Sequence, residues 1–288
     1  MKAIFQNELR TYFTTLTGYA FAAFILLFVG LYSFVLNLTN NLVNFEYVLT
    51  NMSFIFLIVI PILTMRSFAE ERRQKTDQLL YSLPLSMTQI VMGKFLAMMV
   101  VLLLPTVLIC IYPLILRQYG PVPMGTVYST VVAFVLLGGS LSAIGLFISS
   151  LTESMAISAG LCFTTLLLLY YMSSITGAVA TTALSSLVAF AVVILLLGLI
   201  MRVLTKSTPI SLLFTAVCEC VLVGAYLLWE NHFAGLFASV INSLSVFERF
   251  YTFGQGQFDL ANVVFFLSII VICLFMTVQS LEKRRWNG

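Results

Sequence analysis

Apolar residues follow one another along this chain in runs much longer than the core of a soluble domain needs. A helix that spans a bilayer needs about 20 predominantly apolar residues, and eight runs reach or approach that length. They cover residues 18–38, 47–65, 87–116, 125–150, 155–175, 183–203, 209–229 and 260–281. The pattern predicts an all-α fold: a polytopic transmembrane helical bundle of about eight spans.

Residues 1–16, ahead of the first run, have an amphipathic pattern. At the 100° per residue of an α-helix, polar side chains such as Gln6 and Arg10 fall on one half of the helical wheel. The other half consists of Ile4, Phe5, Leu9, Tyr12, Phe13 and Leu16. This distribution is typical of a helix in the membrane interface. We predict an interfacial elbow helix at 1–16 before a transmembrane domain at 17–288; a plain cytosolic extension of the first span is the alternative.

Residues 230–259, ahead of the last run, are rich in Phe but too polar and interrupted for a full span. Irregular backbone at membrane depth is tolerated only where protein covers it or where it lines a water-filled cavity. The stretch therefore predicts an extracytoplasmic segment made of a short re-entrant or interfacial helical pair.

Composition and charge placement support this organisation. The chain is 61% hydrophobic and 9% charged, whereas soluble domains have roughly a quarter of their residues charged. With eight spans, all but Arg117 and Arg249 of the 14 Lys and Arg residues lie on one side of the membrane. Because cytosolic loops carry the excess of Lys and Arg, both termini and residues 66–83 are predicted to face the cytosol.

The 66–83 segment is the most highly charged part of the chain. Seven of the 25 charged residues fall between Arg66 and Asp77, in mixed sign. A solvated loop that obeys the orientation rule would explain the basic residues, but Asp and Glu contribute little to orientation. Mixed charges instead favour a docking contact, because they give a polar interface its register. The residues alone leave both interpretations open.

The sequence shows no catalytic or cofactor-binding motif. His232 is the only histidine, so an HExxH zinc site is excluded, and the stretch GGSLSAIG at 138–145 does not match GxSxG. Gly93-Lys94-Phe95 lacks the Ser or Thr of a phosphate-binding loop, and Lys94 is predicted to extend its amine toward the membrane surface. We therefore expect no enzyme activity, cofactor or metal in this chain, and no nucleic-acid binding.

Two features within the spans allow a second interpretation. Glu219 is an acid in the middle of the seventh run, and ionisable residues inside spans are functional candidates. It indicates a protonated side chain hydrogen-bonded to a neighbouring helix, a side chain that faces a water-filled cavity, or an ion-coupling site. A metal site with Cys218 and Cys220 is a weaker alternative, since no His lies nearby. Small residues around Gly138 and Gly145 predict close helix packing, within one chain or between subunits.

Three stretches carry a resemblance to a known family. The run PILTMRSFAEERRQKTDQLLYSLPLSMTQIVMGKFLA at 61–97 resembles the permeases of type-2 ABC (ABC-2) transporters, as does LSAIGLFISSLTES at 141–154. SVFERFYTFGQGQFDL at 245–260 and TVQSLEKRRW at 277–286 are similar to the gliding-motility-associated branch. Lys75 stands where the family usually has Gly, and residues 180–229 depart from its six-span core. The first run matches the family pattern at Glu70, Glu71, Arg72, Thr76, Leu79, Leu80, Pro84, Ser86, Ile90, Gly93, Lys94 and Ala97.

The resemblance implies a membrane permease subunit, expected to be an exporter, in a prokaryotic plasma or inner membrane. ATP and Mg would bind to a separate ABC ATPase, and a second permease subunit, identical or homologous, would complete the pathway. An auxiliary membrane protein is a further implied partner, besides membrane lipid. A second cytosolic contact is expected at Glu153. The resemblance places coupling to the ATPase at Glu70, Glu71, Arg72, Arg73, Thr76, Asp77, Leu79 and Leu80.

Two other functions remain open on the sequence. A stand-alone secondary transporter would use Glu219 for ion coupling and have no ATPase partner. A membrane scaffold or sensor would use the 66–83 segment to dock a cytosolic protein. The sequence does not name a substrate.

Overall fold

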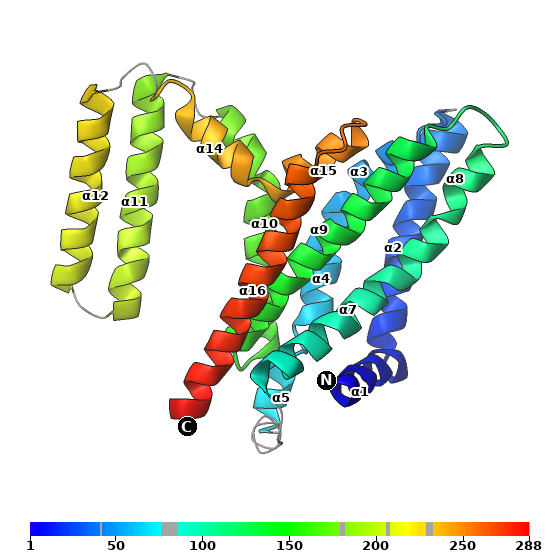
Figure 1. Cartoon of the computed structure of the whole chain (residues 1–288), viewed down its shortest axis with the longest axis horizontal. Coiled ribbons are helices and arrows are strands. Elements are labelled where there is room, and N and C mark those ends of the chain that lie inside the picture. The colour runs from blue at the N-terminus through cyan, green and yellow to red at the C-terminus, as the bar shows by residue number, and fades with distance from the viewer. Residues whose placement is uncertain (41, 76–85, 179–181, 206–207, 229–232, 288) are drawn as a thin grey trace. The chain divides into compact units, whose positions relative to one another are not determined.

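The computed structural model describes residues 1–40, 42–75, 86–178, 182–205, 208–228 and 233–287, and these are helices joined by short turns (Figure 1). The chain divides into two compact units. Unit 1 contains Met1–Leu168 and Arg249–Gly288, and unit 2 contains Leu169–Glu248. The described part of the chain contains no strand, so the predicted all-helical membrane fold is confirmed.

Six described helical segments are long and apolar enough to span a membrane: Leu16–Thr39, Glu46–Arg73, Met87–Leu116, Met124–Leu151, Met155–Ser174 and Leu260–Arg285. They correspond to six of the predicted spans. Their elements are α2 (Leu16–Ser33) with η1 (Phe34–Thr39), α3 (Glu46–Met52) with η2 (Ser53–Ile55), α4 (Phe56–Thr64) and α5 (Ala69–Arg73), α7 (Met87–Ile109) with α8 (Ile111–Leu116), α9 (Met124–Leu151), α10 (Met155–Ala178) and α16 (Leu260–Asn287).

Helix α9 forms the centre of unit 1 and packs against α3, α4, α7 and α16. Its small residues permit this approach. A Cβ added at Gly145 would lie 2.5 Å from the Thr64 hydroxyl of α4, and one at Gly138 would lie 2.7 Å from Leu102 of α7. These glycines are therefore used for packing within the chain, which is the first of the two alternatives for this stripe.

The helix expected at 1–16 is α1 (Lys2–Thr14), and it is separated from α2 by extended backbone at Thr15. Gln6 and Arg10 are exposed, whereas Leu9 is partly covered and Tyr12 is buried, as the wheel predicts. Helix α1 packs on α7, where Ile4 lies close to Gly93. Its position in the membrane interface stays a prediction.

Unit 2 contains the two remaining predicted spans. They are the helices α11 (Ala183–Thr205) and α12 (Thr208–Leu228), which pack on each other. Their described apolar stretches, Ala183–Leu195 and Thr215–Gly224, are shorter than a span, so the eight-span count stays a prediction. The helical pair expected within 230–259 consists of α14 (Leu236–Leu244) and α15 (Val246–Gly254), and its re-entrant placement is likewise a prediction.

Candidate functional site

The charged residues that the sequence singled out gather at one end of unit 1, which we call the charged end. Helix α1, the turn at Met65–Phe68, α5, the first turns of α7 and the last turns of α9 and α16 all contribute to it. Both chain termini lie at this end (Figure 1). The turn and α5 are continuous, so the site is built from five segments of the sequence: α1, residues 65–73, α7, α9 and α16.

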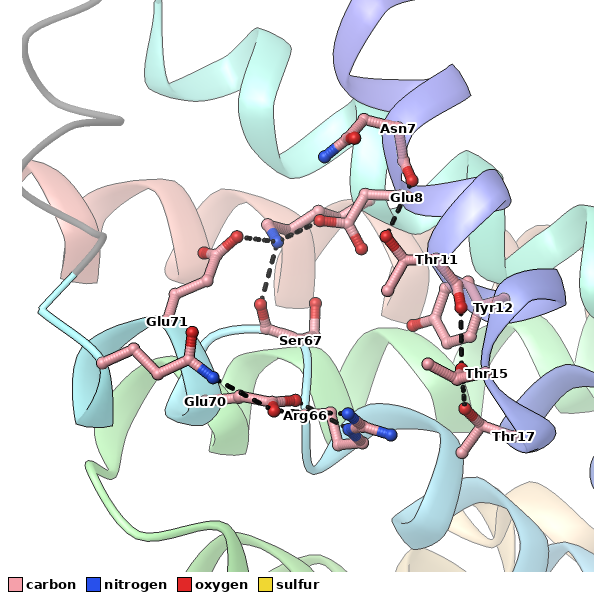
Figure 2. A pocket seen from close by; sticks show the side chains of 12 residues that line it. Asn7, Glu8, Thr11, Tyr12, Thr15, Thr17, Arg66, Ser67, Glu70 and Glu71 are labelled. Atoms are coloured by element: carbon pink, nitrogen blue, oxygen red, sulfur yellow. Dashed lines mark hydrogen bonds and ion pairs between the residues drawn. The ribbon is translucent and has the colours of Figure 1, made fainter.

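Lys94 is the most deeply buried charge of this end, with 1% of its side chain exposed. Its Nζ donates to Glu8 Oε1 at 2.5 Å, to Glu71 Oε1 at 2.7 Å and to the Ser67 carbonyl at 2.9 Å. Figure 2 shows Glu8, Ser67 and Glu71 converging on this amine. We call these four residues the Lys94 cluster. A buried ammonium group is tolerated only when it is paired and hydrogen-bonded, and the cluster meets that condition.

The predicted extension of Lys94 to the membrane surface is wrong. Helix α1 packs over this end of α7, and the Lys94 side chain is 1% exposed. It meets two carboxylates instead, and thereby joins α1, α5 and α7. Sequence reasoning missed this site because Glu8 and Lys94 are 86 positions apart. A lysine within an apolar run was the signal that could have indicated it.

A second ion pair lies beside the cluster. Arg66 Nε donates to Glu70 Oε2 at 2.7 Å and its Nη2 donates to Glu70 Oε1 at 3.2 Å. The Gln74 amide also donates to Glu70, at 3.3 Å. Two parallel bonds between a guanidinium and a carboxylate fix orientation as well as distance. This pair therefore holds the turn before α5 against α5 itself.

The beginning of α5 is fixed to α9. The Ser149 hydroxyl accepts hydrogen bonds from the backbone N–H groups of Phe68, at 3.1 Å, and Ala69, at 3.3 Å. These N–H groups have no partner within the helix, because the first turn of any helix leaves its donors free. Arg72, which is 8% exposed, donates to the Thr152 carbonyl at 3.3 Å. Contacts from the end of α9 thus hold the first N–H groups of this short helix and its Arg72 side chain.

The eight predicted coupling residues fall into two groups. Glu70, Glu71 and Arg72 have partners inside the chain, whereas Arg73 is exposed. The remaining four lie within 76–85, outside the described residues: Thr76, Asp77, Leu79 and Leu80. Among the described residues of the segment, Arg73 and its neighbours Gln74 and Lys75 are the ones open to an external partner.

Lys75, which stands where the resembling family usually has Gly, ends this helix in the left-handed region, with φ +57°. Glycine adopts that conformation without the steric cost that a Cβ imposes. A lysine at this position therefore strains the turn locally.

Glu153, the predicted second contact, is 81% exposed and lies 3.8 Å from Arg284 Nη1. Arg284 also donates to the Leu151 carbonyl at 2.8 Å. The end of α16 is thereby placed next to the end of α9 at the charged end. An ion pair this long and this exposed contributes little to stability, so Glu153 remains accessible.

Glu219 lies in α12, away from the charged end in the sequence, and its hydrogen bonding differs from that of the residues above. Its Oε1 is buried and has no hydrogen-bond partner among the described residues. The described residues contain no group of three His, Cys, Asp or Glu side chains that could hold a metal ion, so they give no support to a metal site at Cys218 and Cys220.

A polar pocket of about 280 Å³ opens between α1, the Met65–Phe68 turn and α5, beside the Lys94 cluster (Figure 2). Tyr12 lines it and donates from its hydroxyl to the Leu63 carbonyl at 3.3 Å. Burial raises the pKa of Tyr12 well above its usual value, and the nearby Glu8 carboxylate raises it further. The phenol therefore stays protonated and remains a hydrogen-bond donor.

The chain matches a known protein family over most of its length. The model of the family described as ABC-2 family transporter protein matches residues 28–279, which is most of the chain. A search of the curated proteins finds no match. The matched region includes residues 180–229, where the resemblance was weakest, and the gliding-motility branch stays a prediction. The members of this family are membrane transport components and not themselves catalytic. The chain therefore belongs to the ABC-2 transporter family, as a permease-type membrane subunit of an ABC transporter.

Proposed function

We propose that this chain exports its substrate by coupling to ATP hydrolysis on a separate ABC ATPase, together with a second, identical or homologous permease subunit. The observation that carries the proposal is the charged end of a chain that belongs to the ABC-2 family. There a short helix, α5, is fixed by buried polar contacts, and its last residue, Arg73, is exposed. In this proposal the charged end faces the cytosol.

Rigid attachment is what a coupling element needs. A push on α5 from an ATPase would reach α1 and α7 through the Lys94 cluster, and α9 through Ser149 and Thr152. These contacts join α5 to three helices, α1, α7 and α9, which contain or adjoin a candidate span. A loop without such contacts would absorb the motion by changing its own shape.

The exposed charge at Arg73 suits the contact with the ATPase. Charged groups at the rim of an interface set register and association rate more than affinity. The internally paired Glu70 and Glu71 would then stabilise the shape of the segment, and the direct contact would fall to Arg73 and the residues after it. The roles of Thr76, Asp77, Leu79 and Leu80 in this contact are part of the proposal.

The test is affinity purification through a tag after Gly288 in mild detergent, followed by identification of the co-purifying chains and an ATPase assay. We expect an ABC ATPase to co-purify with the wild type. Arg73→Glu should reduce its recovery or its substrate-stimulated hydrolysis several-fold, while the permease keeps its abundance. Lys283→Glu is the matched control, because Lys283 is an exposed base on α16 near the same end. Recovery of a non-ATPase partner alone would favour a scaffold and contradict the proposal.

A second candidate function is a secondary transporter driven by an ion gradient through Glu219. The orphaned, buried Oε1 of that residue favours it, because a buried carboxyl without a partner costs free energy and such groups persist in functional sites. Purified chain in proteoliposomes distinguishes the two. Transport driven by a proton or sodium gradient without an ATPase, and abolished by Glu219→Gln, would support the second function.

A further inference from the structure

Two cavities of opposite character adjoin at the start of α2. The first is the polar pocket of about 280 Å³ described above. The second is an apolar groove of about 100 Å³ lined by Thr17, Ala20, Phe21, Phe24, Ile62 and Leu63, among others. Thr17 lines both cavities, and Tyr12 of the pocket is bonded to the backbone of Leu63 in the groove. Together they form one amphipathic site.

The polar pocket has an excess of negative charge. Its lining contains three carboxylates, Glu8, Glu70 and Glu71, and two cations, Arg66 and Lys94. Each cation already pairs with a carboxylate of the lining. With three carboxylates and two cations, the lining has a net charge of −1. Its electrostatics favour a ligand that brings a positive group.

A buried hydroxyl in the pocket also lacks a partner. The Ser67 side chain is 4% exposed, and its Oγ makes no hydrogen bond among the described residues. Ser67 lines the pocket and lies between Glu71 and Tyr12 in Figure 2. Buried polar atoms are usually satisfied, so this hydroxyl points to a polar ligand group that completes it.

The groove provides the complementary apolar part. Phe24 is 37% exposed and Ile62 is 46% exposed, and both lie on helical segments long and apolar enough to span a membrane. The groove therefore opens toward the hydrocarbon region of the bilayer, whereas the pocket lies at the end of the spans where the elbow helix crosses. A ligand that fills both must have a polar head and a hydrocarbon tail.

We propose that this site binds a phospholipid of the surrounding leaflet whose headgroup ends in a primary amine, of the phosphatidylethanolamine class. The ammonium group lies among Glu8, Glu70 and Glu71, and the first part of one acyl chain lies in the groove. The phosphate is near Arg66, whose side chain is partly exposed. A headgroup without an amine lacks the positive charge, and a quaternary ammonium group has no N–H to donate to carboxylates or to the Ser67 hydroxyl.

Bound lipid would stabilise the position of the elbow helix α1. The site is bordered by α1 on one side and by α4 and α5 on the other, so an occupant contacts both. The lipid therefore acts as an additional link between the N-terminal helix and the segment proposed to meet the ATPase, and does not depend on that proposal.

The groove is tested with two tryptophan variants. Ala20→Trp fills the groove, whereas Ala23→Trp places the same side chain one turn further along α2, at an exposed position outside both cavities. The full chain is purified in mild detergent from membranes that contain phosphatidylethanolamine and phosphatidylglycerol, and retained lipid is measured by native mass spectrometry. We expect Ala20→Trp to retain about tenfold less phosphatidylethanolamine, the effect of losing contact with roughly two methylene groups. Ala23→Trp should behave as wild type.

The headgroup is tested with two lysine variants. Asn7→Lys adds a positive charge inside the polar pocket, and Gln6→Lys adds the same charge on an exposed position outside it. We expect Asn7→Lys to lower the retention of phosphatidylethanolamine about tenfold, as loss of one charge-assisted hydrogen bond does, and Gln6→Lys to leave it unchanged.

Competition between lipids shows which headgroup class the site binds. In nanodiscs of mixed composition, wild type should select phosphatidylethanolamine over phosphatidylglycerol and phosphatidylcholine. Equal retention of all three, or a preference for phosphatidylglycerol, would overturn the proposal. So would unchanged retention in both Ala20→Trp and Asn7→Lys. All variants should elute as the wild type in size exclusion, which separates loss of the site from loss of the fold.

Discussion

Two regions of this chain contain an ionisable residue within an apolar helix, and the two residues differ in their hydrogen-bond partners. Lys94 in α7 is 1% exposed and has two carboxylates and a carbonyl around its amine. Glu219 in α12 has a buried oxygen with no partner among the described residues. The first charge is compensated by carboxylates of α1 and α5 and by the Ser67 carbonyl, and removing it takes a buried partner from both carboxylates. The second can lose its charge at little cost, because no described group depends on it.

The comparison explains why the charged end suits a mechanical role and α12 does not. A buried charge with several partners fixes the helices that provide them, since each bond must break before a helix can move. An isolated acid fixes nothing. An ionisable group within an apolar helix therefore links helices at Lys94, whereas at Glu219 it links none among the described residues.

Lys94→Met should have the largest effect. It takes from Glu8 and Glu71 the buried ammonium group that both contact, and loss of one partner of a buried pair costs about 3–5 kcal/mol. Chemical denaturation in detergent should show this loss of unfolding free energy, together with lower abundance. Lys283→Met, at an exposed position, should change it by less than about 0.5 kcal/mol.

Combining Lys94→Met with Glu8→Gln and Glu71→Gln should recover much of that loss, because the triple variant leaves no charge unpaired. A Lys94→Met protein as stable as the wild type would show that the cluster contributes no stability and would remove the contrast with Glu219.

Ser149→Ala should have a smaller effect. It removes the acceptor of two backbone N–H groups at the start of α5, and an unsatisfied buried donor costs about 1–3 kcal/mol. Hydrogen exchange at Phe68 and Ala69 should accelerate at the same time. Ser268→Ala is the control, since that hydroxyl is exposed and bonds only to Phe265 of its own helix. Unchanged exchange at both amides would mean that α9 does not hold α5.

Lys75→Gly should stabilise the chain. The left-handed backbone at Lys75 costs a residue with a Cβ roughly 1–2 kcal/mol, whereas glycine adds roughly 0.5–1 kcal/mol of entropy cost. The expected net gain is about 0.5–1 kcal/mol of unfolding free energy. Lys75→Ala retains the Cβ and should give no such gain; equal gains in both variants would assign the effect to the lost charge.

Glu219→Gln should have the smallest effect, within about 0.5 kcal/mol of wild-type stability. ATP-dependent transport should also remain near wild type, because the residue has no charged partner among the described residues. Transport assays in proteoliposomes that contain the ATPase check this. Loss of transport with normal assembly and ATPase activity would make Glu219 a working residue and restore ion coupling.

Much of the fold could be predicted because a long run of apolar residues in the sequence directly indicates a helix that can span a membrane. The six full spans, the amphipathic face of α1 and the pair α14 and α15 follow local patterns of three to twenty residues. The cap of α7 does too: the Ser86 hydroxyl accepts from the Gln89 N–H at 3.3 Å, as the Ser–Gln spacing predicts.

The site could be predicted only in part. A local pattern identifies which residues are charged, and it cannot show which distant helices meet. Glu8 meets Lys94 through the packing of α1 on α7, where Ile4 lies close to Gly93, and Glu71 meets it from α5. The departure at Lys75 from the glycine usual in the resembling family was visible in the sequence, but its left-handed backbone came from the structure.

Site-directed photo-crosslinking from position 73 tests the central claim most directly. A photoreactive residue replaces Arg73, and the same residue replaces Lys283 as a control at an exposed position on α16. The coupling proposal predicts that position 73 crosslinks to an ABC ATPase in native membranes, with a yield that changes when ATP is added, and that position 283 gives much less product. Crosslinks from position 73 that reach only lipid or this chain, in membranes where the ATPase co-purifies with the permease, would contradict it.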